Sequence, residues 1–113
     1  MKALLAQSPA ISPWVPRRQW EPPSVALATI AAQSDRHDVR VADMVVWRRR
    51  APARFLETLE RFRPRVVGFS AMTFQYDTAL RFAALTKRHD ASILTVLGGY
   101  HATTSAAQNY AVF

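Results

Sequence analysis

Short apolar segments alternate with helix-length amphipathic segments along this chain, and this alternation restricts the possible folds more than any other feature. Val66-Val67-Gly68-Phe69-Ser70 is almost entirely apolar, a helical pattern follows over 76–89, and another apolar segment begins roughly 27 residues after the first. Strands that alternate with helices in this way form βαβ units with right-handed crossovers. The sequence therefore predicts an α/β fold built on a doubly wound parallel sheet.

Four strands are predicted, each bounded by polar or turn-forming residues. They are Lys2–Gln7, Asp38–Ala42, Val66–Ser70 and Ser92–Leu97. Between them, Ser24 can cap a helix that runs to about Ser34. Pro52 suits the first turn of a helix that ends before Pro64. Its apolar face holds Phe55, Leu56, Leu59 and Phe62, and the next helix, Tyr76–His89, is predicted to turn Leu80, Ala83, Ala84 and Leu85 inward.

Loops complete the pattern. Ser8 to Pro23 contains five prolines and is long for so small a chain, which is typical of functional lids and binding segments. Arg48 to Ala51 is also predicted to be a loop. After Gly98-Gly99, a short helix is expected near Ser105 to Asn109, and Ala111-Val112-Phe113 resembles the first half of a fifth strand. We therefore expect one domain over residues 1–113, incomplete at its C-terminus and so a fragment of a longer protein.

Composition excludes several kinds of chemistry. The chain has no Cys, so a disulfide, a thiolate zinc site, a cysteine nucleophile and a cysteine-ligated iron–sulfur cluster are all excluded within its 113 residues. The N-terminus lacks the apolar run of about 7–15 residues that a secretory signal needs, and no stretch approaches the roughly 20 residues of a membrane span. These features lead us to expect a cytoplasmic protein without membrane contact.

The formal net charge of +7 raises the hypothesis of a nucleic-acid interaction module. Trp47 precedes Arg48-Arg49-Arg50, and an aromatic ring beside cations can stack on a base. The remaining basic residues, however, are scattered beside Glu or Asp, apart from Arg17-Arg18 in another loop. A solvated basic surface explains this distribution better.

Candidate site residues follow the predicted strands, because ligands of open parallel sheets bind outside the carboxyl ends of the strands. Ser70 ends one strand and provides a hydroxyl group. Gly98-Gly99 ends the next and allows a ligand to approach the backbone. Met72, Phe74 and Tyr76 provide an apolar rim.

Two segments carry a family resemblance: Val-Val-Gly-Phe-Ser-Ala-Met-Thr (66–73) and Thr-Val-Leu-Gly-Gly-Tyr-His-Ala-Thr (95–103). Together with the opening Lys-Ala-Leu-Leu, the Pro-rich loop and the Asp-Val-Arg-Val-Ala-Asp strand, they resemble the cobalamin-binding domain that precedes the catalytic barrel of cobalamin-dependent radical S-adenosylmethionine enzymes. That family pairs a Ser-x-Leu segment with a later Gly-Gly; this chain has Ser70-x-Met72 and then Gly98-Gly99.

The resemblance implies a flavodoxin-like/Rossmann-like fold and a module that binds cobalamin. It implies cofactor contacts from six residues: Ser70, Met72, Thr73, Gly98, Gly99 and Tyr100. The expected partner is a C-terminal radical S-adenosylmethionine domain, which would hold S-adenosylmethionine and a 4Fe-4S cluster outside this chain and carry out methyl transfer or a related radical reaction.

The chain departs from many cobalamin proteins in lacking Asp-x-His-x-x-Gly, the motif that supplies a cobalt ligand. The radical branch of the family often lacks it as well. His101 follows the Gly-Gly pair, but such a residue is more often a structural hydrogen-bonding group, so we nominate no metal ligand and no catalytic residue. A small catalytic or signalling α/β domain stays an alternative, although Asp38, Asp43 and Asp77 form no obvious phospho-acceptor cluster and no Gly-x-Ser-x-Gly motif is present.

Overall fold

The computed structural model describes residues 1–8, 25–72, 75–99 and 102. Its elements are β1 (Lys2–Gln7), α1 (Val25–Ala32), β2 (Asp38–Asp43), α2 (Met44–Trp47), the 3₁₀ helix η1 (Arg48–Arg50), α3 (Ala51–Phe62), β3 (Val66–Ser70), α4 (Tyr76–His89) and β4 (Leu94–Gly98). The expected elements at Ser105 to Asn109 and Ala111 to Phe113, and almost all of the Pro-rich loop, lie outside the described residues.

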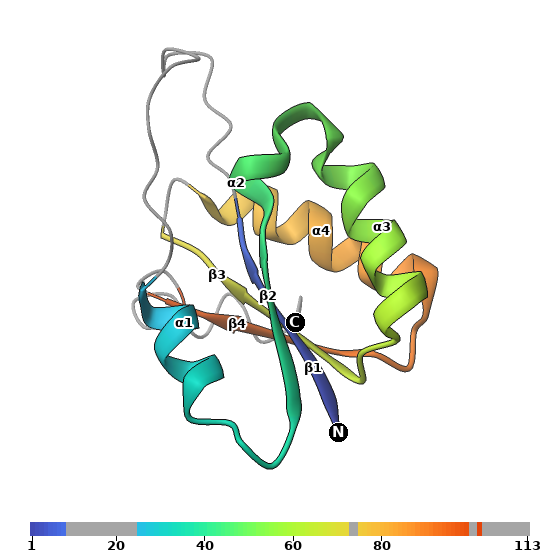
Figure 1. The fold of residues 1–113 in the computed structure, drawn as a ribbon. Helices are drawn as coiled ribbons and strands as arrows, with labels where there is room; N and C mark the ends of the chain where they lie inside the picture. The colour runs from blue at the N-terminus through green and yellow to red at the C-terminus, as the bar shows by residue number, and fades with distance from the viewer. Residues whose placement is uncertain (9–24, 73–74, 100–101, 103–113) are drawn as a thin grey trace.

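The described strands form a parallel sheet in the order β2-β1-β3-β4 (Figure 1). This order is that of a flavodoxin-like, doubly wound fold, so the predicted α/β class is confirmed. The strand order reverses between β1 and β3, because the chain leaves β1 for one edge and later returns to its other side. The carboxyl ends of β1 and β3 therefore border the point where such folds bind ligands.

The predicted strand and helix boundaries agree with the structure to within a few residues, with two differences in kind, of which the first is that the short helix α2 was not predicted. Arg48 to Ala51 is not a loop: Arg48–Arg50 forms η1, and Ala51 begins α3. Pro52 lies in the first turn of α3, as predicted, where its missing N–H costs no helical hydrogen bond. A loop was predicted because three consecutive arginines form a polar stretch. A single 3₁₀ turn can form in such a stretch because it is short and does not require an apolar face.

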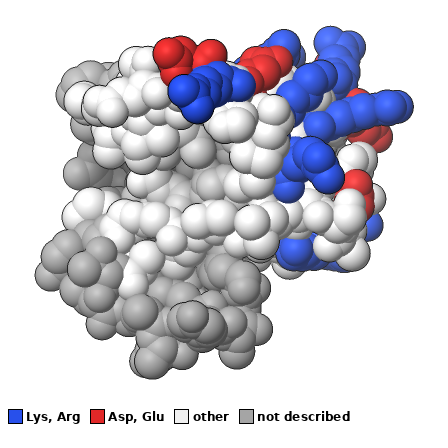
Figure 2. Space-filling view, turned by 90° about the horizontal axis from the view of Figure 1, so that it is seen from below, with Lys and Arg blue, Asp and Glu red and all other residues white. Residues whose placement is uncertain are grey.

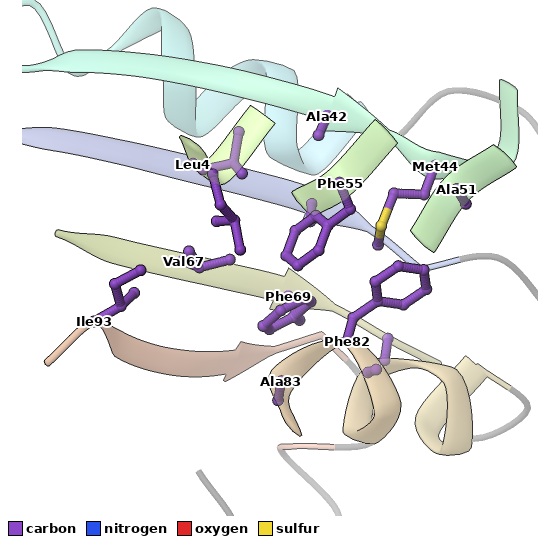
Figure 3. Packing of buried hydrophobic residues seen from close by; sticks show 14 of the residues in the cluster. Leu4, Ala42, Met44, Ala51, Phe55, Val67, Phe69, Phe82, Ala83 and Ile93 are labelled. Atoms are coloured by element: carbon purple, nitrogen blue, oxygen red, sulfur yellow. The ribbon is translucent and has the colours of Figure 1, made fainter. Parts of the chain in front are cut away.

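One face of the sheet is covered by α3 and α4, and we call it the helix-pair face. Leu4 and Ala6 of β1 and Val67 and Phe69 of β3 point into it, each almost fully buried. Phe55 of α3 lies between two other rings, with centroids 6.0 Å from Phe69 and 5.1 Å from Phe82 (Figure 3). Burial of these rings and aliphatic groups is the main source of stability in the described core.

The prediction of which side of α4 faces the core was wrong for most of the residues named, because the helix is rotated about its axis relative to the predicted orientation. Ala84 is exposed and Leu80 and Leu85 are only partly buried, whereas Phe82 and Thr86 are buried along with Ala83. Phe82 provides the largest apolar area on this helix, and packing against Phe55 turns it inward. Thr86 can follow it into the core because its hydroxyl donates a hydrogen bond to the Phe82 carbonyl at 2.8 Å.

The opposite face of the sheet, which we call the α1 face, carries alternate strand residues such as Leu5, Gly68 and Val96. Helix α1 lies against β1 and β2 on this side (Figure 1). Leu27 is the buried residue of α1, so this largely apolar helix makes a narrower contact than its composition suggests. On β4, Leu94 and Val96 are 58% and 45% exposed, which leaves an apolar strip on this face.

None of the described helices has the length and apolar character required to cross a membrane.

Candidate functional site

The last residues of the strands form a row across the carboxyl end of the sheet. Gln7 pairs in register with Asp43 on one side and with Ser70 on the other, and Ser70 pairs with Gly98. Paired residues of parallel strands point to the same face, so all four belong to the α1 face. The structure thus brings Ser70 and Gly98 side by side, as the sequence predicted, and adds Gln7 and Asp43 to the same row.

The next row on the α1 face is apolar. Val41, Leu5, Gly68 and Val96 follow one another across β2, β1, β3 and β4. Ser70 and Gly98 have little or no side chain at the ends of β3 and β4, whereas the Leu5 side chain lies over Gly68, where a Cβ would be 3.1 Å from Leu5 Cδ2. A ligand lying there would meet polar groups at the strand ends and apolar surface farther in.

Gly98 and Gly99 have different roles. Apart from its chain neighbours, a Cβ atom at Gly98 would come no closer than 3.9 Å to any described atom, the nearest being the Phe69 carbonyl oxygen, so the described residues leave room for a side chain there. Gly99 has a φ of +95°, and a Cβ there would lie 2.8 Å from the Ala71 carbonyl oxygen. Gly99 is therefore required by the backbone itself, whereas Gly98 keeps the surface free.

The backbone after β3 is held close to the end of β4. The Ala71 N–H donates a hydrogen bond to the Gly98 carbonyl at 3.1 Å. The Met72 N–H donates to Gln75 Oε1 at 2.9 Å, and the Gln75 N–H donates back to the Met72 carbonyl at 2.9 Å. Met72 is 47% exposed, and its contact with a cofactor stays a prediction. Of the other predicted contacts, Thr73 and Tyr100 lie outside the described residues, as does His101.

Ser8 is a polar residue at this end that the sequence analysis did not single out. It follows β1 directly, is fully buried, and its hydroxyl has no hydrogen-bond partner among the residues that the structure describes. A buried hydroxyl without a partner costs about 1–3 kcal/mol. Its place at the strand-order reversal, next to the row that contains Gln7, makes it a group that a bound ligand could satisfy.

The structure gives little support to the hypothesis that the basic residues form a nucleic-acid interaction surface. Trp47, the aromatic residue expected to stack on a base, packs partly buried against the hydrophobic core. Arg49 and Arg50 are exposed on η1. Among the described residues, no group of three or more His, Asp or Glu side chains could hold a metal ion.

Comparison with known proteins identifies the family. Residues 17–113 match the protein-family model described as the B12 binding domain. The chain belongs to the B12-binding domain family. Neither a curated protein nor a solved structure gave a match. As a member of this family, the chain is a cobalamin-binding module, and its fold and the row at its strand ends agree with that function.

Several residues of this B12-binding domain could be placed at the site only from the structure. Gln7, Asp43 and Gly68 were not singled out, because their importance depends on the register of the strands. A signal was nevertheless available for Gln7 and Asp43, since each ends a strand whose carboxyl end faces the ligand side of the sheet. Ser8 carried no signal, because a single serine before a proline is common in loops.

Proposed function

We propose that this B12-binding domain holds cobalamin across the β3–β4 half of its α1 face and presents the corrinoid to a radical S-adenosylmethionine barrel. The observation that carries the proposal is the row of Gln7, Ser70 and Gly98 in register, with an apolar row behind it. An extended cofactor tail needs such a surface, with polar groups at the strand ends and apolar contacts farther in.

Three residues of this chain would hold the cofactor. Gly98 leaves space for the tail, because a Cβ there would lie no closer than 3.9 Å to a described atom beyond its chain neighbours. The Ser70 hydroxyl, half-buried at the strand end, can donate to or accept from a polar group of the tail. The Ser8 hydroxyl is buried without a hydrogen-bond partner among the described residues and could donate a hydrogen bond to a cofactor acceptor at the strand-order reversal.

The reaction belongs to the partner domain in this proposal. When bound, cobalamin supplies a cobalt centre that can carry a methyl group. S-adenosylmethionine and a 4Fe-4S cluster would be held by Cys residues of the barrel, since this chain has no Cys. The segments 66–73 and 95–103, which resemble the radical branch of the family, support this choice of partner.

Reconstitution tests the binding site. The protein is mixed with hydroxocobalamin and desalted, and the corrin absorbance that remains with it is measured. We expect the wild-type protein to retain cobalamin and Gly98→Val to lose it. Valine fits a strand, and its Cβ would make only an ordinary van der Waals contact with the Phe69 carbonyl oxygen, at 3.9 Å, while its methyl groups would occupy the space above Gly98.

Thr95→Val is the matched control. It lies on the same strand but on the helix-pair face and keeps the side-chain volume. It removes a buried hydroxyl that has no hydrogen-bond partner in the described part of the chain. It should retain cobalamin like the wild type. Equal retention by Gly98→Val would contradict the proposed site, and no retention by the wild-type protein would contradict the proposed function of this chain.

The partner domain is tested separately by reading the gene beyond the codon for Phe113. A continuation into a Cys-x-x-x-Cys-x-x-Cys segment is expected. A continuation without any such segment would reject the radical S-adenosylmethionine partner while leaving the cobalamin site untouched.

A further inference from the structure

A second surface lies at the opposite end of the sheet, far from the row formed by the strand ends. The α3–β3 turn and the α4–β4 turn enclose a groove of about 920 Å³. We call it the amino-end groove; its lining includes Leu59, Pro64, Val66 and Ile93, which give it an apolar base. This volume lies in the range of about 300–1,000 Å³ typical of small-molecule and cofactor pockets.

The rim of the amino-end groove is rich in charge. Arg63 and Arg65 line it, and the Arg65 N–H donates a hydrogen bond to the Lys2 carbonyl at 2.9 Å, which places a third basic residue beside them. Figure 2 views the molecule from this end and shows Lys and Arg side chains gathered along one side, with acidic side chains among them. Arg63 and Arg65 are exposed, and their guanidinium groups make no hydrogen bond or ion pair within the described residues.

Arg63 occupies a backbone position that does not favour arginine. It follows α3 with φ 52° and ψ 59°, a left-handed conformation that no other described non-glycine residue adopts. Its N–H caps the helix by donating to the Leu59 carbonyl at 3.1 Å, a hydrogen bond that glycine would make equally well. Glycine or asparagine is the usual residue here, so the fold does not account for the arginine side chain.

The acidic residues on the rim indicate what kind of partner fits. Glu60 and Asp90 also line the groove. Hydrogen bonds from the Ser92 hydroxyl and N–H, at 2.7 and 2.9 Å, lower the pKa of Asp90 and keep its carboxylate ionised. A nucleic-acid backbone, which carries a phosphate at every step, would approach both carboxylates closely. A protein segment can instead place its acidic groups on the two arginines alone.

We propose that the amino-end groove docks an acidic segment of a partner protein, with carboxylates on Arg63 and Arg65 and an apolar side chain between them. The groove and the proposed cofactor row lie at opposite ends of the strands. A partner could therefore dock while cobalamin is bound, and the two sites can be tested independently.

Binding is measured with a fluorescein-labelled peptide that repeats Glu-Leu-Glu-Gly, and with the same peptide carrying Gln in place of Glu. The wild-type protein should bind the Glu peptide more tightly. Arg63→Gly and Arg65→Gln should each weaken that binding by about two- to fivefold, as expected for loss of one exposed charge contact. Raising the salt to about 1 M, where the screening length is about 3 Å, should remove the difference between the two peptides.

Arg81→Gln is the matched control, since Arg81 is an exposed residue of α4 that does not line the groove. It should leave peptide binding unchanged.

Arg63→Gly should also unfold at the same denaturant concentration as the wild type or a higher one, because glycine relieves the left-handed backbone. Unchanged stability would show that weaker peptide binding by Arg63→Gly is not caused by unfolding. Unchanged cobalamin retention by the same variant would show that the groove can fail without loss of the proposed cofactor site.

Three results would overturn the proposal: no binding of the Glu peptide, equal binding of the Glu and Gln peptides, or binding that Arg63→Gly and Arg65→Gln leave unchanged. A single-stranded DNA oligonucleotide is titrated in parallel. If it binds more tightly than the Glu peptide and both variants weaken it, the groove is a nucleic-acid surface and the protein partner is rejected.

Discussion

The two faces of the sheet are built from the same strands but from different kinds of residue. On the helix-pair face, Leu4, Val67 and Phe69 are at most 1% exposed and pack against aromatic rings from α3 and α4. On the α1 face, Leu94 and Val96 stay 58% and 45% exposed. Residues that alternate along one strand thus meet opposite environments.

This difference between the two faces suggests that the helix-pair face provides stability and that the α1 face is available for the proposed binding. Large side chains on the helix-pair face fill a packed core, where each lost methylene group is felt. Small residues at the strand ends of the α1 face, among them Ser70 and Gly98, contribute little burial and leave the surface that we propose for the cofactor. A substitution should therefore affect either stability or binding according to the face on which it lies.

The largest expected effect tests the helix-pair face. Phe55→Ala removes a fully buried ring that contacts both Phe69 and Phe82. It should lower the free energy of unfolding by about 3–5 kcal/mol, measured by urea denaturation. Val96→Ala, on the α1 face, should cost less than about 1 kcal/mol because its side chain is already half exposed. Similar losses from the two substitutions would show that both faces are equally buried.

Cobalamin itself should stabilise the α1 face. A ligand that binds only the folded protein, at a free concentration about 100 times its dissociation constant, raises the free energy of unfolding by about 2.7 kcal/mol. We expect this increase in the wild type and in Thr95→Val, and none in Gly98→Val, from thermal unfolding with and without hydroxocobalamin. An equal increase in all three proteins would place the cofactor elsewhere.

The two adjacent glycines should respond differently to alanine. Gly99→Ala puts a methyl group 2.8 Å from the Ala71 carbonyl oxygen at a φ of +95°, and should cost about 1–3 kcal/mol of unfolding free energy. Gly98→Ala meets no close atom, so its effect should stay within about 0.5 kcal/mol. Denaturant midpoints decide this comparison, and an equal cost at the two positions would mean that Gly98 is also required by the backbone.

The smallest expected effect concerns the edge strand β2. The Arg40 guanidinium lies on the helix-pair face, 4.3 Å from the centre of the Phe62 ring. Arg40→Ala should lower the free energy of unfolding by about 0.5–1 kcal/mol, the usual size of an exposed cation–π contact. Val41→Thr, next to it on the α1 face and 45% exposed, should change less. A larger loss from Val41→Thr would reverse the assignment of the two faces on this strand.

Much of the fold could be predicted from local patterns. The bounds of β1, β3 and α4 agree with the prediction because apolar runs, Pro64 and the helical period are visible within a few residues. The inward face of α4 could not be predicted, since Phe82 and Thr86 turn inward only because Phe55 of another helix receives Phe82. Similarly, Ser70 and Gly98 were predicted as site residues from their spacing, whereas Gln7 and Asp43 lie in the same row only through the register of four strands.

The sequence by itself determined the α/β class, the parallel arrangement and the two strand ends that carry Ser70 and the glycine pair, because these depend on periodicity and on residues close together in the chain. Only the tertiary structure decided which face each strand residue occupies, the different roles of Gly98 and Gly99, and the left-handed backbone of Arg63 beside the amino-end groove. These features depend on contacts between elements far apart in the sequence. Such contacts form only when the helices pack on the sheet and set its register.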